Sequence, residues 1–406
     1  MTRMTRRTLV GTLAAAPLAK PGIIRAQTAS APIRIGLLSD VGGPYQDVGG
    51  PGSKVAAEMA VQDFGGSVLG RPIEVLQADD QNKADIASAL AREWITDQGV
   101  NVLADGAASS AGLAIQQITR DKKRIFLMST PTATALIGKQ CSPYGFQFAA
   151  DTYALAKGVG GALSKAGGNT WFFITADYEF GTSLQTNTEQ FIKQAGGQVL
   201  GGVRAPLGTA DFSSYLVQAA ASGAKVIGLA NAGTDLRNCI KQAAEFGIVK
   251  HGQRLATLLM MVPDVLSLGQ DVCQGLVLTN SFYWDQSPGT RAWTQRYVAK
   301  MSKPPTEYNA GMYAGVLHWL QAVKATGTLD ADATAAKMRA LPLDDFYNSN
   351  VRIMANGCVP HTMYLWEVKP AAAAKHRWDL FNLIGTMPTP DAYPPAGLFG
   401  CPLSPA

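Results

Sequence analysis

Short runs of apolar residues recur along this chain, and stretches with helical spacing separate them. The runs cover residues 33–38, 73–76, 100–104, 125–128, 171–174, 198–201, 226–229, 255–259 and 276–279. They are nearly continuous in apolar residues instead of alternating with polar ones, which is typical of parallel strands that are covered on both faces. The pattern therefore predicts an α/β fold built from parallel sheets.

The first run leads into a loop rich in glycine and proline. Residues 36–45 read Gly-Leu-Leu-Ser-Asp-Val-Gly-Gly-Pro-Tyr, and a helix is expected over about 53–64. Ligands of such α/β domains lie in loops at the carboxyl ends of parallel strands. We therefore expect this loop, and the loops after the neighbouring strands, to form a binding site.

The runs form two successive blocks, each with enough βα units for one domain. A mostly helical region follows and is expected to return to the first block, and a last strand at 363–368 is expected to join the second. The predicted division is lobe 1 (32–148 plus 282–360), lobe 2 (149–281 plus 361–385) and a C-terminal covering tail (386–406). Two lobes that the chain crosses between more than once predict a hinge that closes on a ligand.

Residues 1–26 have the layout of a bacterial secretory signal, with Arg6 and Arg7 ahead of an apolar run and a small-residue exit near Ala26. The paired arginines indicate the twin-arginine type and a periplasmic mature protein; the alternative is a disordered basic tail.

Five basic residues and no acidic one lie in this segment, so the formal net charge of +5 falls to zero without it. We therefore expect no nucleic-acid partner. No later apolar run reaches the ~18 residues that span a bilayer, so we expect a soluble mature protein.

Enzyme and metal motifs are missing from the sequence. It contains no G-x-S-x-G elbow, no P-loop, no H-E-x-x-H and no dinucleotide fingerprint. The histidines and cysteines are scattered: His251, His318, His361, His376, Cys141, Cys239, Cys273, Cys358 and Cys401. No two cysteines have the C-x₂₋₄-C spacing of a zinc site. We expect no enzyme activity, no metal and no cofactor, and one or two disulfides in an oxidising compartment.

Several stretches are similar in order and spacing to one family of proteins. They are 35–45 (IGLLSDVGGPY), 55–61 (VAAEMAV), 69–75 (LGRPIEV), 176–181 (ADYEFG) and 209–213 (TADFS). The chain resembles, over about 32–402, the leucine/isoleucine/valine-binding family of periplasmic solute-binding proteins that feed ABC transporters. The resemblance implies a type I fold, which has two Rossmann-like lobes joined by a three-segment hinge. It also implies a ligand in the cleft and permease subunits as partners; we expect a monomer.

Three further stretches resemble a branch of that family linked to uptake of aromatic acids. They are 171–178 (WFFITADY), 231–233 (NAG) and 281–285 (SFYWD). The resemblance implies a small carboxylate as the ligand, with an aromatic acid favoured. A branched-chain amino acid or amide is the alternative ligand, and a sensory ligand-binding module is the alternative role.

Two loops are candidates for holding the ligand's carboxylate. Ser109 and Ser110 open a predicted helix over 109–120, and Thr132 and Thr134 lie in the loop after the next strand. Free amides and the dipole of a helix start favour an anion, and the resemblance places the carboxylate at these loops. Plain helix capping and a polar turn are the alternative.

Six aromatic side chains and one amide are candidates for the rest of the cleft. They are Tyr45, Tyr153, Tyr178, Phe180, Asn231, Tyr283 and Trp284. Flat side chains bracket an aromatic ring, which is worth ~1 kcal/mol each beyond burial. Ordinary core packing is the alternative for each of them.

The amino acid binders of the family hold the substrate ammonium with an acidic side chain of the second lobe. The corresponding loop, 259–264, lacks the usual glutamate, and Asp264 is the remaining acidic candidate. A buried ammonium without a paired carboxylate is costly. This departure argues against an α-amino acid as the ligand.

The resemblance also implies one disulfide. Related sequences carry cysteine in settings similar to residues 139–143 (KQCSP) and 400–403 (GCPL). The implied pair is Cys141 with Cys401, which would pin the tail near the first crossing.

Overall fold

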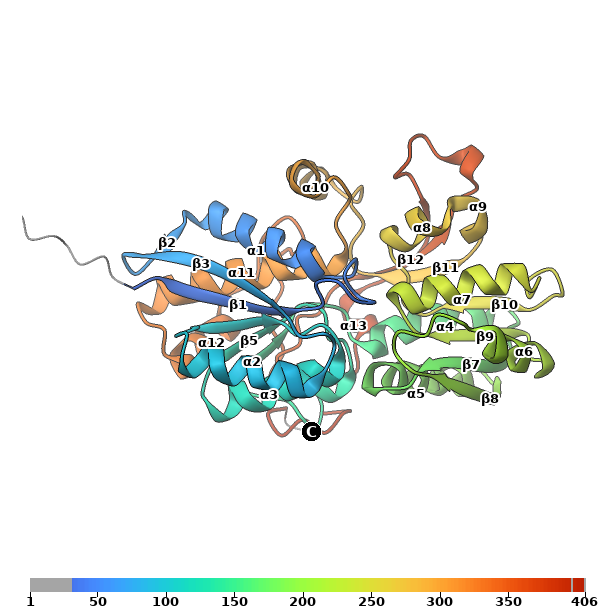
Figure 1. Ribbon diagram of the computed structural model, residues 1–406, viewed down its shortest axis with the longest axis horizontal. Helices are drawn as coiled ribbons and strands as arrows, with labels where there is room; N and C mark the ends of the chain where they lie inside the picture. Colours follow the sequence, from blue (N-terminus) through green and yellow to red (C-terminus); the bar gives the residue numbers. More distant parts are fainter. Residues whose placement is uncertain (1–30, 396, 405–406) are drawn as a thin grey trace, which may run out of the picture.

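The computed structural model describes residues 31–395 and 397–404 and consists of two α/β halves that lie side by side (Figure 1). Each half has its own parallel sheet with helices packed on it. The predicted fold class, an α/β protein of two lobes with parallel-type sheets, is confirmed. The predicted signal peptide over 1–26 lies outside the described residues.

The sheet of the first half has six strands in the order β2-β3-β1-β4-β5-β6. They are β1 (Ile33–Ser39), β2 (Ser67–Val68), β3 (Arg71–Asp79), β4 (Val102–Asp105), β5 (Ile125–Met128) and β6 (Gly145–Gln147). Neighbours from β3 to β6 run parallel, and the two-residue β2 pairs antiparallel with β3. The loops after β1, β4 and β5 therefore lie along one edge of the sheet.

The helices of this half come from two distant parts of the chain. They are α1 (Gly50–Phe64), α2 (Ala84–Thr96), α3 (Ser109–Asp121), α10 (Pro288–Met301), α11 (Glu307–Thr326) and α12 (Ala331–Ala340). Helix α11 packs along α1, and α2 packs along α3. The mostly helical region after residue 282 therefore completes the first half.

Gly36 in β1 allows a close approach between strand and helix. The Trp94 side chain of α2 is buried against this strand, and a Cβ at Gly36 would lie 2.5 Å from the indole carbon Cε3. The ring belongs to a core cluster with Leu38 and Leu103. A larger residue at position 36 would displace it.

The second half has a four-stranded parallel sheet in the order β10-β9-β7-β8. Its strands are β7 (Thr170–Ala176), β8 (Gln198–Ala205), β9 (Val226–Ala230) and β10 (Arg254–Thr257). Its helices are α4 (Thr152–Lys165), α5 (Glu179–Gln194), α6 (Ser213–Ala221), α7 (Gly233–Glu245), α8 (Val262–Leu268) and α9 (Gln270–Cys273). Short helical pieces elsewhere are η1 (Thr134–Leu136), η2 (Ala371–Ala373) and α13 (Thr389–Ala392).

A separate antiparallel sheet corrects part of the prediction. It consists of β11 (Val277–Asn280), β12 (Met363–Val368) and β13 (Phe381–Met387). The run at 276–279 is a strand, but it pairs antiparallel with β12 and not in the parallel sheet. Strand β13 was not predicted, because most of its side chains are exposed and it has no continuous apolar pattern. The short β6 was also not predicted.

The chain passes between the halves after β6, after β11 and before β12. We propose the lobe limits 32–148 plus 282–360 and 149–281 plus 361–387. The second lobe here ends two residues later than residue 385, because β13 continues to Met387. No helix in the described part of the chain is both long and apolar enough to cross a membrane.

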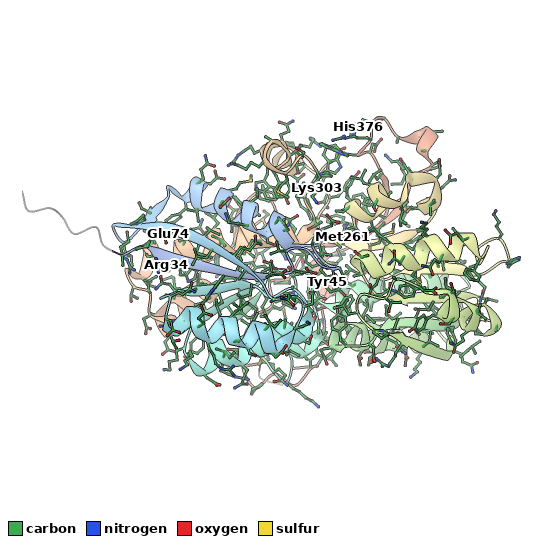
Figure 2. All side chains as sticks on the ribbon, in the orientation of Figure 1. Arg34, Tyr45, Glu74, Met261, Lys303 and His376 are labelled. Atoms are coloured by element: carbon green, nitrogen blue, oxygen red, sulfur yellow. A yellow bond between two sulfur atoms is a disulfide. The ribbon has the colours of Figure 1, made fainter. Side chains whose placement is uncertain are left out.

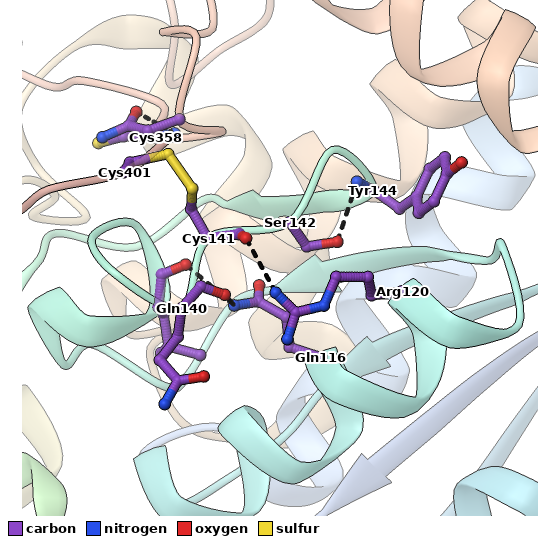
Figure 3. Close-up of a disulfide and its surroundings, with 10 residues drawn as sticks. Gln116, Arg120, Gln140, Cys141, Ser142, Tyr144, Cys358 and Cys401 are labelled. Carbon is purple, nitrogen blue, oxygen red and sulfur yellow. Dashed lines mark hydrogen bonds between the residues drawn. A yellow bond between two sulfur atoms is a disulfide. The ribbon is translucent and has the colours of Figure 1, made fainter. Parts of the chain in front are cut away.

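The tail is attached near the first crossing by a disulfide between Cys141 and Cys401, whose Cα atoms are 5.7 Å apart (Figure 3). This is the pair that the resemblance implies. The ring of Phe399 packs against Tyr153 of α4, with ring centroids 5.8 Å apart. The tail therefore lies against both the first half and α4.

Replacing Cys401 by serine should destabilise the fold. The disulfide joins residues 260 positions apart, and loss of a native disulfide costs about 2–5 kcal/mol of unfolding free energy. Urea unfolding should show a lower midpoint for Cys401→Ser, and a reductant should shift the wild type but not the variant. Equal midpoints for the two oxidised proteins would contradict a stabilising role for this bond.

Candidate functional site

A cavity lies between the halves, and its empty space of about 270 Å³ includes open solvent. Its first-half wall consists of Tyr45, Val48, Ala107, Ser109, Thr130, Thr132 and Tyr308, and its second-half wall of Tyr178, Phe180, Ala232 and Leu259. Figure 2 shows Tyr45 where the two halves meet. None of these eleven described side chains carries a charge. The wall combines aromatic rings, hydroxyl groups and small apolar residues.

Helix α3 begins at the cavity, and no side chain caps its first amide groups. Ser109 is the first residue of the helix, and its Oγ accepts hydrogen bonds from the Thr132 amide at 3.3 Å and the Ala133 amide at 3.2 Å. Ser109 therefore joins two loops instead of capping its helix. The uncapped amides and the helix dipole favour an anion at this end of the cavity.

A buried carboxylate behind this wall orients one of its hydroxyl groups. Asp105, at the end of β4, accepts hydrogen bonds from Ser39 Oγ at 2.6 Å, from Ser129 Oγ at 3.1 Å and from Thr130 Oγ1. Burial raises the pKa of Asp105, and the hydroxyl donors oppose this shift. Because Thr130 donates its proton to Asp105, its oxygen offers the cavity only an acceptor.

The loop that carries Tyr45 is folded around the carboxylate of Asp40. Its Oδ1 accepts from the Gly43 amide at 2.5 Å, and its Oδ2 accepts from the Tyr45 amide at 2.7 Å and from Asn82 Nδ2 at 2.5 Å. Asp40 is almost fully buried. This carboxylate fixes the position at which Tyr45 reaches the other half.

Two phenols meet across the cavity. The hydroxyl oxygens of Tyr45 and Tyr178 are 2.5 Å apart, and the Tyr178 ring lies 5.9 Å from the Phe180 ring. Burial raises the pKa of both tyrosines, and the nearby carboxylate of Asp235 raises both further. Both phenols are therefore neutral, and together they can donate one hydrogen bond beyond their own contact.

The backbones of the two halves are also in contact. The Thr234 amide donates to the Pro44 carbonyl at 3.1 Å. Gly233 has a φ of +58°, and a Cβ there would lie 2.3 Å from the Pro44 oxygen. Arg237 adds an ion pair with Asp47 at 3.4 Å. The structure is therefore a closed form, in which loops of both halves touch around the cavity.

Asp264 does not line the cavity. Its Oδ2 accepts from the Met261 amide at 2.9 Å, and its Oδ1 lies 3.3 Å from Arg237 Nη1. Burial raises the pKa of Asp264 to about 6, and the Arg237 charge lowers it. Both oxygens are occupied, so this carboxylate is not free to pair with a ligand ammonium.

Five of the predicted ligand-binding residues line the cavity: Tyr45, Ser109, Thr132, Tyr178 and Phe180. Three others of the same region do not. Ser110 is half-buried in α3. Thr134 bonds to Ser183, with 3.0 Å between the two hydroxyl oxygens, and Tyr153 packs against Phe191 and the tail. The sequence places these three residues in or near the predicted loops, but it does not determine which way their side chains point.

The remaining three predicted residues do not line the cavity either. Asn231 is buried, and its neighbour Ala232 forms the wall instead. Tyr283 OH donates to the Trp378 carbonyl at 2.7 Å, and Trp284 Nε1 donates to the same oxygen at 3.0 Å. The Trp284 ring also packs against His376 and Trp378, which lie in the segment between β12 and β13.

Six of the lining residues were not predicted from the sequence: Val48, Ala107, Thr130, Ala232, Leu259 and Tyr308. Most belong to the strand-end loops already singled out. Tyr308 is different, because it lies in the first turn of α11, far along the chain from the other lining residues of the first half. The only sequence feature that marks this position is a helix-capping pattern, in which Thr306 precedes Asn309 by three positions.

Metal binding has no support in the described ranges, where no group of three or more His, Cys, Asp or Glu side chains is placed to hold an ion. The arrangement at the cavity suits reversible binding of a small molecule. Hydroxyl groups and helix amides can hold an anion, and the rings can enclose an apolar body.

Comparisons with known proteins agree with this geometry. The profile of a family described as "Periplasmic binding protein" matches residues 32–375. "Leu/Ile/Val-binding protein homolog 6" of Brucella melitensis is 22% identical over 302 residues, which cover 73% of this chain and 76% of that protein.

Two solved structures share the fold. A periplasmic binding protein from Burkholderia mallei is 46% identical, with a TM-score of 0.87, over 89% of this chain and 96% of that chain. A solute binding protein of an ABC transporter from Rhodopseudomonas palustris BisB5, in complex with 3,4-dihydroxy benzoic acid, is 21% identical, with a TM-score of 0.80, over 88% and 97%. With the profile match covering most of its length, this chain belongs to the periplasmic binding protein family, the solute-binding proteins of ABC transporters.

Proposed function

We propose that this protein captures a small carboxylate, an aromatic acid, in the cavity between its halves and delivers it to the permease of an ABC transporter. One observation carries the proposal. The cavity wall joins four aromatic side chains to a helix start and hydroxyl groups, and its eleven residues include no charged side chain.

The anionic end of the ligand fits the start of α3. Uncapped amides carry partial positive charge there, and the hydroxyl groups of Ser109 and Thr132 lie beside them. Carboxylates bind such sites without a cationic side chain because hydrogen bonds to a charged group are worth about 1.5–3 kcal/mol each. A neutral wall therefore suffices for an anion.

The body of the ligand fits the aromatic part of the wall. Tyr45, Tyr178, Phe180 and Tyr308 surround it from both halves. We therefore expect a ligand whose aromatic ring lies among these four side chains.

A branched-chain amino acid is the competing ligand, and the names of several relatives favour it. A Leucine-, isoleucine-, valine-, threonine-, and alanine-binding protein of Pseudomonas aeruginosa is 22% identical over 339 residues, which cover 80% of this chain and 87% of that protein. An amino acid brings an ammonium group, which needs a carboxylate when it is buried. The wall has none, and Asp264 is already paired with Arg237.

The location that we propose is the periplasm, with export directed by residues 1–26. The family is extracytoplasmic, and this supports the location. A sensory role would use the same cavity, and an adjacent gene for a permease or for a histidine kinase would distinguish the two roles.

A thermal-shift screen tests the ligand class. Benzoate, 4-hydroxybenzoate and 3,4-dihydroxybenzoate should raise the melting temperature of the mature protein, because a ligand at 100 times its Kd stabilises the native state by about 2.7 kcal/mol. Leucine and valine should leave it unchanged. A shift with leucine or valine and none with the aromatic acids would overturn the proposed ligand.

Substitutions in the two hydroxyl loops test the carboxylate site. Ser109→Ala and Thr132→Val should each weaken binding of the best aromatic acid by about tenfold or more, since each removes a polar partner of a charged group. Titration calorimetry gives the affinities. Thr119→Val is the matched control, because its buried hydroxyl donates to carbonyls of its own helix, α3, and does not line the cavity. Unchanged affinity in the first two variants would rule out this end of the cavity as the anion site.

A further inference from the structure

A buried polar chain links the three crossings between the halves. Phe148 lies at the first crossing, Ser281 at the second and His361 at the third. His361 Nε2 donates to the Phe148 carbonyl at 3.2 Å, and its ring stacks on Tyr347 with centroids 4.5 Å apart. The Tyr347 hydroxyl lies 2.6 Å from Ser281 Oγ. The third crossing therefore contacts the first directly and is linked to the second through Tyr347.

Glu307, at the start of α11, connects this series of polar contacts to the first half. Its Oε2 accepts hydrogen bonds from the Ser281 amide at 2.7 Å and from Ser281 Oγ at 2.6 Å. Glu307 is 2% exposed and Ser281 is 4% exposed. Because Ser281 donates its hydroxyl proton to the carboxylate, Tyr347 donates to Ser281. Buried bonds of this kind to a carboxylate are about twice as strong as neutral ones.

The same helix start also touches the cavity. Tyr308, next to Glu307, lines it. Thr306 Oγ1 donates to the carbonyl of Val48 at 2.7 Å, and Val48 belongs to the wall as well. The N-cap residue Thr306 and the first two residues of α11 therefore connect the cavity wall to the second crossing.

We propose that Glu307, Ser281 and Tyr347 are positioning residues that stabilise the closed arrangement of the hinge. They do not line the cavity, so they act on binding through the populations of the open and closed forms. The inference rests on the proposed function, because hinge closure matters for a protein that binds its ligand between two lobes. When the binding-competent fraction falls, apparent affinity falls by the same factor for every ligand.

The experiment compares Glu307→Gln and Tyr347→Phe with the wild type. Tyr144→Phe is the control, because it also removes a tyrosine hydroxyl, whose partner Asp332 at 2.5 Å lies within the first half. Small-angle scattering gives the ligand-free radius of gyration, and calorimetry gives affinities for benzoate and 4-hydroxybenzoate.

Both hinge variants should have a larger ligand-free radius, and both ligands should bind about tenfold more weakly, by the same factor. Tyr144→Phe should match the wild type. A hinge variant that matches Tyr144→Phe in radius and affinity overturns the inference, as does a change in the ratio of the two affinities.

Two further results are informative. If Glu307→Gln does not fold, Tyr347→Phe decides by the same criteria. If neither ligand binds the wild type, the proposed aromatic ligand fails, while the ligand-free radii of Tyr347→Phe and Tyr144→Phe still decide the role of the hinge chain. Equal radii would then overturn it, and a larger radius for Tyr347→Phe would support it.

Discussion

The carboxylate of Asp40 determines where the two halves can meet. It accepts hydrogen bonds from two amides of its own loop and from the side chain of Asn82. These bonds hold Tyr45 beside Tyr178. The cavity exists because that loop stands at the carboxyl end of β1, beside the loops after β4 and β5. A buried carboxylate that lost these donors would be costly, so loop shape and lobe contact depend on the same group.

Much of the fold could be predicted from the sequence, because parallel strands buried on both faces leave continuous apolar runs. The same rule placed the binding loops at the strand ends, and Ser109, Thr132 and Tyr178 do line the cavity. The pattern was less informative where burial is partial. Strand β13 exposes most of its side chains, and β11 is apolar but pairs antiparallel.

The rest of the site depends on tertiary contacts that a local pattern cannot contain. Tyr283 and Trp284 lie near a crossing, as predicted, yet both donate to the carbonyl of Trp378, about ninety residues away. Tyr308 reaches the cavity only because α11 packs along α1. The Cys141–Cys401 pair came from resemblance alone, since spacing does not determine connectivity.

The proposed function requires an uncharged wall to hold the carboxylate of an aromatic acid. A crystal structure of the protein with 4-hydroxybenzoate would show whether it does. We expect the carboxylate within hydrogen-bond distance of the first amides of α3, with the ring between Tyr45 and Phe180 and both lobes in contact. A carboxylate bound away from α3, or an α-amino acid retained in the cavity in place of the aromatic acid, would rule out the proposed binding mode.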